Sequence, residues 1–215
     1  MSDEAPLLSE ELLDGLLARW AAAGLPLAPA LRRGLSDAEM DELTAPLGLR
    51  LPGEARLWWG RHDGAPSATP DGRRLDRRLT RSFEYLPLAA CIDIYREYRR
   101  LAEASAAEMG AFRAEMAHPD YFFHRALFPI TDSGGAGIVV CDCSVADGAP
   151  TPIRWIEPSE MAQGLPAPKA PSFGAMVVRW IEAWDRPLWG YDAAAGRWVD
   201  HLENRTEADN RSRLV

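Results

Sequence analysis

The residues of this chain that could act as nucleophiles or metal ligands are three cysteines and four histidines. Cys141 and Cys143 flank Asp142 in a segment with a strand pattern, so both thiols are expected on the same face of that strand. Two thiols without a second cysteine pair or a histidine pair make a poor zinc site. Cys91 lies near the start of a helical segment, and the odd number of cysteines argues against a disulfide framework. We therefore interpret the thiols as small buried hydrophobic side chains.

The histidines do not have the spacing of a metal site. His118 and His124 lie on either side of Pro119, and His62 and His201 stand alone in the sequence. None forms the i, i+4 pair that would present two imidazoles to one metal from a helix. The sequence therefore predicts neither a metal site nor a cofactor.

A hydrolase site remains an alternative, because folding could bring His62, Asp132 and Cys141 together in space. The sequence has no Gly-x-Ser-x-Gly elbow, no P-loop and no dinucleotide-binding fingerprint to support it. The glycine-rich stretch 133–137 lies between two strand-like segments rather than before a helix. We interpret it as a hairpin turn, since a phosphate cradle normally uses a helix N-terminus.

The composition is that of a globular protein with an acidic balance. The chain has 215 residues, 47% hydrophobic content and a formal net charge of -8, which suit one sizeable core and an electropositive protein partner. The negative charge disfavours nonspecific binding to nucleic acid. No apolar run approaches the roughly 20 residues that span a bilayer, and the opening Met-Ser-Asp-Glu lacks the order of a secretory signal. We expect a cytoplasmic protein without membrane contact, and the oligomeric state stays open.

A local cluster of arginines runs against this acidic balance. It follows the turn signal Asp71-Gly72 and precedes a predicted strand at 83–86. Acidic residues are interspersed, and the aromatic stacking run of a nucleic-acid groove does not accompany it. We interpret the cluster as a solvated connection, with an anion or RNA contact as the alternative. Its members are Arg73, Arg74, Arg77, Arg78 and Arg81.

The elements that must position these residues begin with a capped helix. Ser36 and Glu39 have the spacing of a capping box, which predicts a helix that starts at about residue 37. Gly48 is expected to end it. Its apolar residues recur at spacings of three and four and are expected to face the core: Met40, Leu43 and Leu47.

A second helix is predicted after the pair Leu51-Pro52. Proline suits the first helical position, where its missing N–H costs nothing. Asp63-Gly64 is expected to end the helix, since glycine tolerates the left-handed conformation that closes one. The apolar surface of this helix comes from Ala55, Leu57, Trp58 and Trp59. The two adjacent tryptophans cannot face the same direction, so either one lines a groove or both are packed in or beside the core.

This segment, LSDAEMDELTAPLGLRLPGEARLWWGRHDG, resembles the entry segment of the SUKH superfamily, which includes fungal cell-wall-synthesis regulators and bacterial immunity proteins against polymorphic toxins. The family pattern is a helix, a Leu-Pro pair, a second helix with an aromatic residue, and a glycine preceded by Asn or Asp. The matching positions are Leu51, Pro52, Trp58, Asp63 and Gly64.

Two further segments follow the order of the family. The stretch FPITDSGG, followed by IVVCD, is similar to the strand, glycine-rich turn and strand of the family and spans 128–142. Pro171-Ser172-Phe173 opens a segment through Trp184 that is similar to the family's closing helix. The order of the three segments carries most of the weight of the resemblance. Its main departure is a long helical insertion at 99–121.

The resemblance implies an α+β fold, SUKH-like, with a twisted, largely antiparallel sheet covered by helices, and a protein that binds rather than catalyses. It implies a bacterial immunity protein that neutralises a polymorphic or contact-dependent toxin, such as a nuclease, by direct binding. The alternatives are a regulatory or scaffold protein of the cell-wall-assembly-regulator type and an uncharacterised hydrolase. The predicted partner contacts are Trp58, Asp63 and Asp132. Their alternative roles are core packing for the tryptophan, helix capping for the first aspartate and support of the glycine-rich turn for the second.

The rest of the sequence predicts flanking elements around this domain. An amphipathic helix at 12–20 precedes a proline-containing linker, and a helical pattern from Leu88 is interrupted around Gly110. Strands are expected at 122–129, 138–143 and 153–156, and a closing hairpin at 189–199. We predict an N-terminal helix and linker at 1–34, a SUKH-like domain at 35–187, and a C-terminal hairpin with a polar tail at 188–215.

Overall fold

The computed structural model describes residues 5–133, 137–157, 165–207 and 209. Its buried hydrophobic side chains form one cluster that extends along the chain from Leu8 to Trp189. Side chains from all three of the regions predicted above contribute to this cluster. The N-terminal helix, the sheet and the closing helix therefore share one hydrophobic core.

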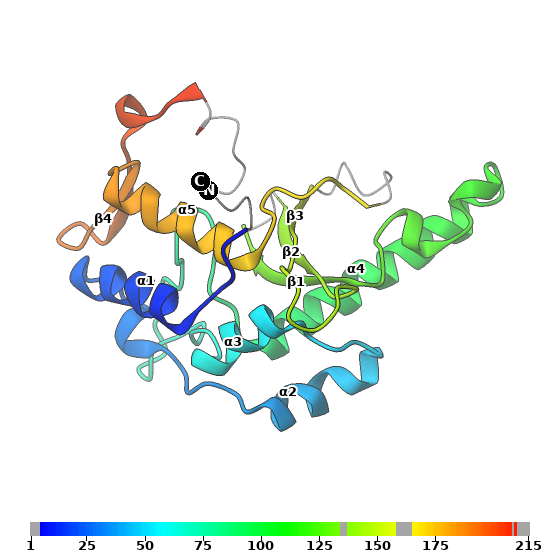
Figure 1. The fold of residues 1–215 in the computed structure, drawn as a ribbon, viewed down its shortest axis with the longest axis horizontal. Coiled ribbons are helices and arrows are strands. Elements are labelled where there is room, and N and C mark those ends of the chain that lie inside the picture. The colour runs from blue at the N-terminus through cyan, green and yellow to red at the C-terminus, as the bar shows by residue number, and fades with distance from the viewer. Residues whose placement is uncertain (1–4, 134–136, 158–164, 208, 210–215) are drawn as a thin grey trace.

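Helix α1 (Glu10–Ala22) lies beside helix α5 (Phe173–Asp185), as Figure 1 shows. The hydroxyl of Ser172 caps α5 by accepting the N–H of Ala175. A guanidinium–carboxylate pair, Arg19 to Asp185 at 2.7 Å, joins the two helices at their outer side. Both helices were predicted from the sequence, and α1 is part of the core through Leu13, Leu16 and Trp20.

Helix α2 (Asp37–Thr44) begins with the predicted capping box, in which Ser36 and Glu39 each accept the other's backbone N–H. The chain leaves it through a 3₁₀ turn that closes at Gly48, where φ is 64°. The prediction that Leu43 faces the core is wrong, because this short helix packs through a narrow stripe and leaves that side chain exposed. The buried positions of α2 are Met40 and Thr44.

Helix α3 (Gly53–Arg61) follows Pro52, which is its N-cap rather than its first helical residue. Gly64 has φ of 65°, and a Cβ placed there would lie 2.5 Å from the carbonyl carbon of Leu86. The position therefore requires glycine, both for its backbone conformation and for the close approach of the segment that leads into the next helix. The predicted apolar side of α3 is buried through Ala55, Trp58 and Trp59.

The central sheet is antiparallel and has the order β1-β2-β3. Its strands are β1 (Leu127–Asp132), β2 (Ile138–Asp142) and β3 (Ile153–Ile156). Because Asp132 pairs with Ile138, the first two strands form the predicted hairpin. The glycines expected in its turn, at 134–136, lie outside the described residues.

Two strand predictions need correction. The strand predicted at 122–129 begins only at Leu127, because a 3₁₀ turn at Pro119–Tyr121 precedes it and the Pro119 carbonyl accepts the N–H groups of Phe122 and Phe123. The strand predicted at 83–86 is absent from the described structure, where Glu84 makes only an isolated bridge. The N–H of Glu84 bonds instead to the backbone oxygen of Asp132 at 3.2 Å, which holds this irregular segment beside the end of β1.

Helix α4 (Leu88–Met109) packs its first half on β1 and extends its second half away from the body of the molecule, as Figure 1 shows. It ends at Gly110, where the sequence predicted an interruption. Two 3₁₀ turns, Ala114–Met116 and Pro119–Tyr121, bring the chain back along this second half. The predicted insertion at 99–121 is therefore a helical arm.

The chain closes with the predicted hairpin of β4 (Trp189–Asp192) and β5 (Arg197–Asp200). The rings of Trp184 and Trp198 lie 5.8 Å apart and tie the hairpin to α5. Helices and antiparallel sheets occur in separate parts of the chain, so the predicted α+β class is confirmed.

Candidate protein-binding surface

Trp58, the first predicted partner contact, lies inside the core. Only 2% of its surface is exposed, and its ring lies 4.5 Å from Tyr85 and 5.2 Å from Phe173. Trp59 is also buried and donates its indole N–H to the Leu86 carbonyl. Both tryptophans therefore have the packing role, and a partner that docks on this conformation meets other side chains.

Asp63, the second predicted contact, is also buried. Its carboxylate accepts the backbone N–H of Leu88 at 2.7 Å and pairs with Arg32 at 3.2 Å. The residue thus supplies a side-chain acceptor to the first turn of α4. The capping alternative had placed this role at the end of the preceding helix, α3. Burial raises the pKa of the Asp63 carboxyl, against the opposing effects of the Leu88 N–H and the arginine.

Asp132, the third predicted contact, lies at the end of β1. Its backbone oxygen accepts the N–H of Glu84, while the neighbouring Thr131 hydroxyl donates to the Glu84 carbonyl at 2.5 Å. These bonds fasten the irregular segment before α4 to the sheet. The three predicted contacts thus belong to different elements: the middle of α3, the cap of α4 and the edge of the hairpin.

Glu54, which was not predicted from the sequence, accepts more hydrogen bonds than any other buried carboxylate among the described residues. One carboxylate oxygen accepts the N–H of Leu8 at 2.7 Å and of Gly174 at 2.9 Å. The other accepts the N–H of Thr151 at 2.6 Å and of Phe173 at 3.4 Å. A signal was present in the sequence, because Glu54 precedes Trp58 by one helical turn and so lies on the buried face of α3.

The outer side of α2 carries the most concentrated acidic charge near these elements. We call its four carboxylates the acidic face; they are Asp37, Glu39, Asp41 and Glu42. Helix α2 itself contains no basic residue. Arg56 reaches from α3 to Asp37 and Asp41, but only 14% of the Arg56 side chain is exposed, against 78% and 59% for the two carboxylates. The negative groups therefore point outward while this counter-charge lies beneath them.

Glu39 is the most strongly perturbed carboxyl of the acidic face. Hydrogen bonds from the Arg33 guanidinium, and then from the backbone and hydroxyl of Ser36, lower the pKa of Glu39 to about 2. Glu42 is exposed and has no ion pair among the described residues. Beside these carboxylates the exposed Leu43 offers an apolar contact.

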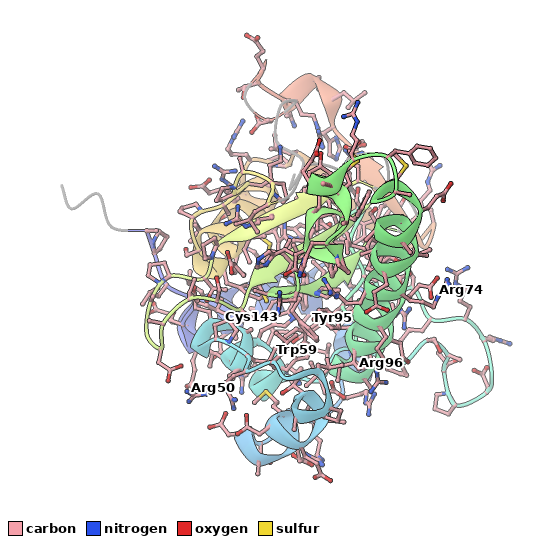
Figure 2. All side chains as sticks on the ribbon, turned by 90° about the vertical axis from the view of Figure 1, so that its right-hand side faces the viewer. Arg50, Trp59, Arg74, Tyr95, Arg96 and Cys143 are labelled. Carbon is pink, nitrogen blue, oxygen red and sulfur yellow. The ribbon has the colours of Figure 1, made fainter. Side chains whose placement is uncertain are left out.

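A cleft of about 360 Å³ lies between the end of α2 and helix α4. Leu47 from the turn after α2 lines one side, and Tyr95 and Glu103 line α4. Figure 2 shows Arg96 on the part of α4 next to α2. We call this the arginine cleft, because its remaining lining residues are Arg96, Arg99, Arg100 and Arg125. The acidic face and the arginine cleft thus have opposite charge, and the helices that carry most of their residues, α2 and α4, contact each other.

The arginine cluster of the loop before α4 is largely engaged in ion pairs. Arg77 bonds Glu84 at 2.6 Å, and Arg81 bonds Asp200 at 2.6 Å. Arg78 makes a similar pair with Asp76. The first and third pairs lie within the loop and the second joins it to the closing hairpin, so these three arginines are partly buried, whereas Arg73 and Arg74 are exposed as a solvated connection requires.

The thiols and histidines have separate environments. The sulfur atoms of Cys141 and Cys143 lie 3.9 Å apart on one side of the chain, as predicted, and Cys91 is buried. The contact with Cys143 and burial raise the pKa of the Cys141 thiol well above its usual range. His62 instead contacts the Arg32 carbonyl through Nδ1 at 3.0 Å. In the described part of the chain no three His, Cys, Asp or Glu residues are grouped to hold a metal ion.

No protein-family model matches this chain, and no curated protein matches it significantly. The SUKH resemblance therefore remains an interpretation of the sequence segments. Within the described residues, no helix is both long and apolar enough to cross a membrane.

Proposed function

We propose that this chain is a cytoplasmic bacterial immunity protein that neutralises a toxin by direct binding and carries out no chemistry of its own. The proposal is supported by the sequence resemblance to the SUKH superfamily and by the acidic face on α2. That face, rather than Trp58 or Asp63, is where an electropositive partner would dock. The partner we propose is a basic toxin domain, such as a nuclease.

The observation that carries this proposal is the outward direction of the acidic face. Asp37, Asp41 and Glu42 remain exposed although Arg56 lies beneath the first two, whereas Glu39 is half-buried and pairs with the exposed Arg33. A surface with an excess of one charge accelerates encounter with a partner of the opposite sign, and the effect weakens as salt screens the charges. Leu43 beside Glu42 supplies an apolar contact that such a docking event could bury.

The decisive experiment is affinity co-purification of the full chain from its native host, followed by mass spectrometry of the bound proteins. Recovery of a multidomain secreted toxin is the expected result. The recovered toxin domain is then tested for binding to the wild-type chain and to the variant D41N/E42Q. A matched control, E108Q/E115Q, removes the same charge from exposed positions of the helical arm.

The acidic-face variant should associate about tenfold more slowly at low salt, with a smaller change in dissociation, whereas the control variant should resemble wild type. Recovery only of housekeeping proteins would refute the immunity proposal and favour the regulatory-scaffold alternative. A toxin that binds both variants as it binds wild type would support immunity but remove α2 from the interface.

A further inference from the structure

The arginine cleft reverses the charge of the molecule locally. Four of its lining side chains are arginines and only Glu103 is acidic, although the chain as a whole has a net charge of -8. At physiological salt, charges separated by more than about 8 Å are largely screened from each other. A group that enters the cleft therefore responds to the arginines more than to the overall charge.

On the outer side of the cleft, two guanidinium groups keep hydrogen-bond capacity. Arg96 contacts Asp93 through Nη1 alone, at 3.5 Å. Arg100 uses Nε and Nη2 on Glu97, which leaves Nη1 without a described partner. Both pairs join residues one turn apart on α4, and such exposed pairs contribute little to stability. A competing carboxylate could therefore replace these contacts at small cost.

On the inner side, two arginines share a single carboxylate. Arg99 bonds Asp120 at 2.7 Å and also donates to the Phe123 carbonyl, and Arg125 bonds the other oxygen of Asp120 at 2.7 Å. One carboxylate neutralises only one of the two guanidinium charges. The inner corner of the cleft therefore keeps an excess positive charge, held in place because the Asp120 and Arg99 side chains are only 14% and 18% exposed.

The shape of the cleft favours the surface of a macromolecule over an enclosed small molecule. Arg96, Arg100 and Arg125 are each more than half exposed, whereas small-molecule sites bury most of their ligand. Tyr95 is the aromatic residue of the lining, and its ring is buried against Phe123 and Phe128. The lining thus offers no open ring on which a nucleic-acid base could stack.

We propose that the arginine cleft receives a carboxylate-bearing segment of the protein partner, an inference that rests on the proposed function. The planar fork of arginine matches the two oxygens of a carboxylate, and several forks around one cleft suit a run of Asp or Glu side chains. Because α2, which carries the acidic face, contacts α4, which lines the cleft, the partner must present basic and acidic groups to neighbouring elements. This paired arrangement fixes the orientation of docking and rejects partners of uniform charge.

The cleft itself is tested with a fluorescein-labelled octaglutamate peptide and the full chain, by fluorescence anisotropy at low salt. The variant R96Q/R100Q removes two exposed cleft arginines, and the matched control R179Q/R197Q removes two exposed arginines on α5 and β5. We expect the cleft variant to bind the peptide roughly tenfold more weakly, and the control variant to bind as wild type does. Equal binding by the two variants, or no binding by wild type, would overturn the inference.

Inorganic phosphate and the recovered toxin domain supply the remaining arms. If phosphate displaces the peptide at submillimolar concentration, the cleft is a phosphate site and the inference fails. With the toxin domain, a loss of affinity in both D41N/E42Q and R96Q/R100Q supports the paired arrangement. Loss in the first variant alone would leave the proposed function standing and remove the cleft from it, whereas failure to recover any toxin would refute the proposed function itself.

Discussion

Replacement of Glu54 by glutamine should destabilise this protein strongly although it removes only one charge. The carboxylate accepts backbone N–H groups from Leu8, Thr151, Phe173 and Gly174. A glutamine keeps one oxygen, which can serve one pair of donors, but it turns an NH₂ group toward the other pair. Two buried N–H groups then lose their acceptor, at about 1–3 kcal/mol each, so a loss of about 4 kcal/mol is expected.

The prediction is measured by urea unfolding followed through tryptophan fluorescence, with the free energy of unfolding extrapolated to water. In a chain of this length a loss of 4 kcal/mol corresponds to a melting temperature lower by roughly 8–16 °C. Glu42→Gln is the matched control, because the same chemical change at an exposed site should alter stability by less than about 0.5 kcal/mol. Faster amide exchange should accompany the loss in the Glu54 variant at one pair of donors, either Leu8 and Gly174 or Thr151 and Phe173.

A change in the free energy of unfolding below about 1 kcal/mol for Glu54→Gln would refute this reasoning, since one orphaned buried donor alone accounts for that much. An equal loss in the Glu42 control would refute it differently, because the effect would then follow the chemical change and not the buried site. Either result would mean that the donors find other acceptors once the carboxylate is gone.

The remaining predictions concern three residues. Glu39 should titrate by NMR with a pKa of about 2, and Arg33→Gln should raise that pKa toward the ordinary value. The stability that this carboxylate contributes is present above its unfolded-state pKa and is lost as the pH falls through about 2. Gly64→Ala should lower the free energy of unfolding by more than Gly48→Ala does. Both positions have a left-handed φ, but only at Gly64 would the added Cβ lie 2.5 Å from backbone atoms. Equal losses of about 1–2 kcal/mol in the two variants would show that backbone strain alone acts. Asp63→Ala should remove a capping acceptor and lose about 1–2 kcal/mol, measured by urea unfolding. Because the pKa of Asp63 is raised, wild type should also lose stability as the pH rises through that pKa, and Asp63→Asn should abolish this dependence.

Local patterns were predicted well because their causes are local. The capping box at Ser36, the interruption at Gly110 and the hairpin after Trp189 depend on residues a few positions apart. The same reasoning failed at 83–86, where aromatic and apolar residues had indicated a strand. There the backbone bonds the end of β1 irregularly, and no local pattern specifies that partner.

The candidate site was harder to predict because exposure depends on how elements pack. Asp63 is next to a helix end in the sequence, yet it caps the following helix, which starts many residues later. Trp58 and Leu43 show the same difficulty in opposite directions: the predicted surface anchor is buried, and the predicted core residue is exposed. The arginine cleft combines α4 with Leu47 and Arg125, so it exists only after the arm has folded back.

The bonds of Glu54 also bear on when this protein can fold during its synthesis. Leu8 is synthesised well before Gly174, because the two residues are far apart in the sequence. Helix α1 can contact α5 only after the segment between them has been translated. Until then, the apolar side of α1 lacks its final packing partner in the nascent chain. We expect the native core to close late, in one step that joins both ends of the chain, rather than domain by domain from the N-terminus. A ribosome-bound chain that stops before α5 should therefore remain sensitive to protease.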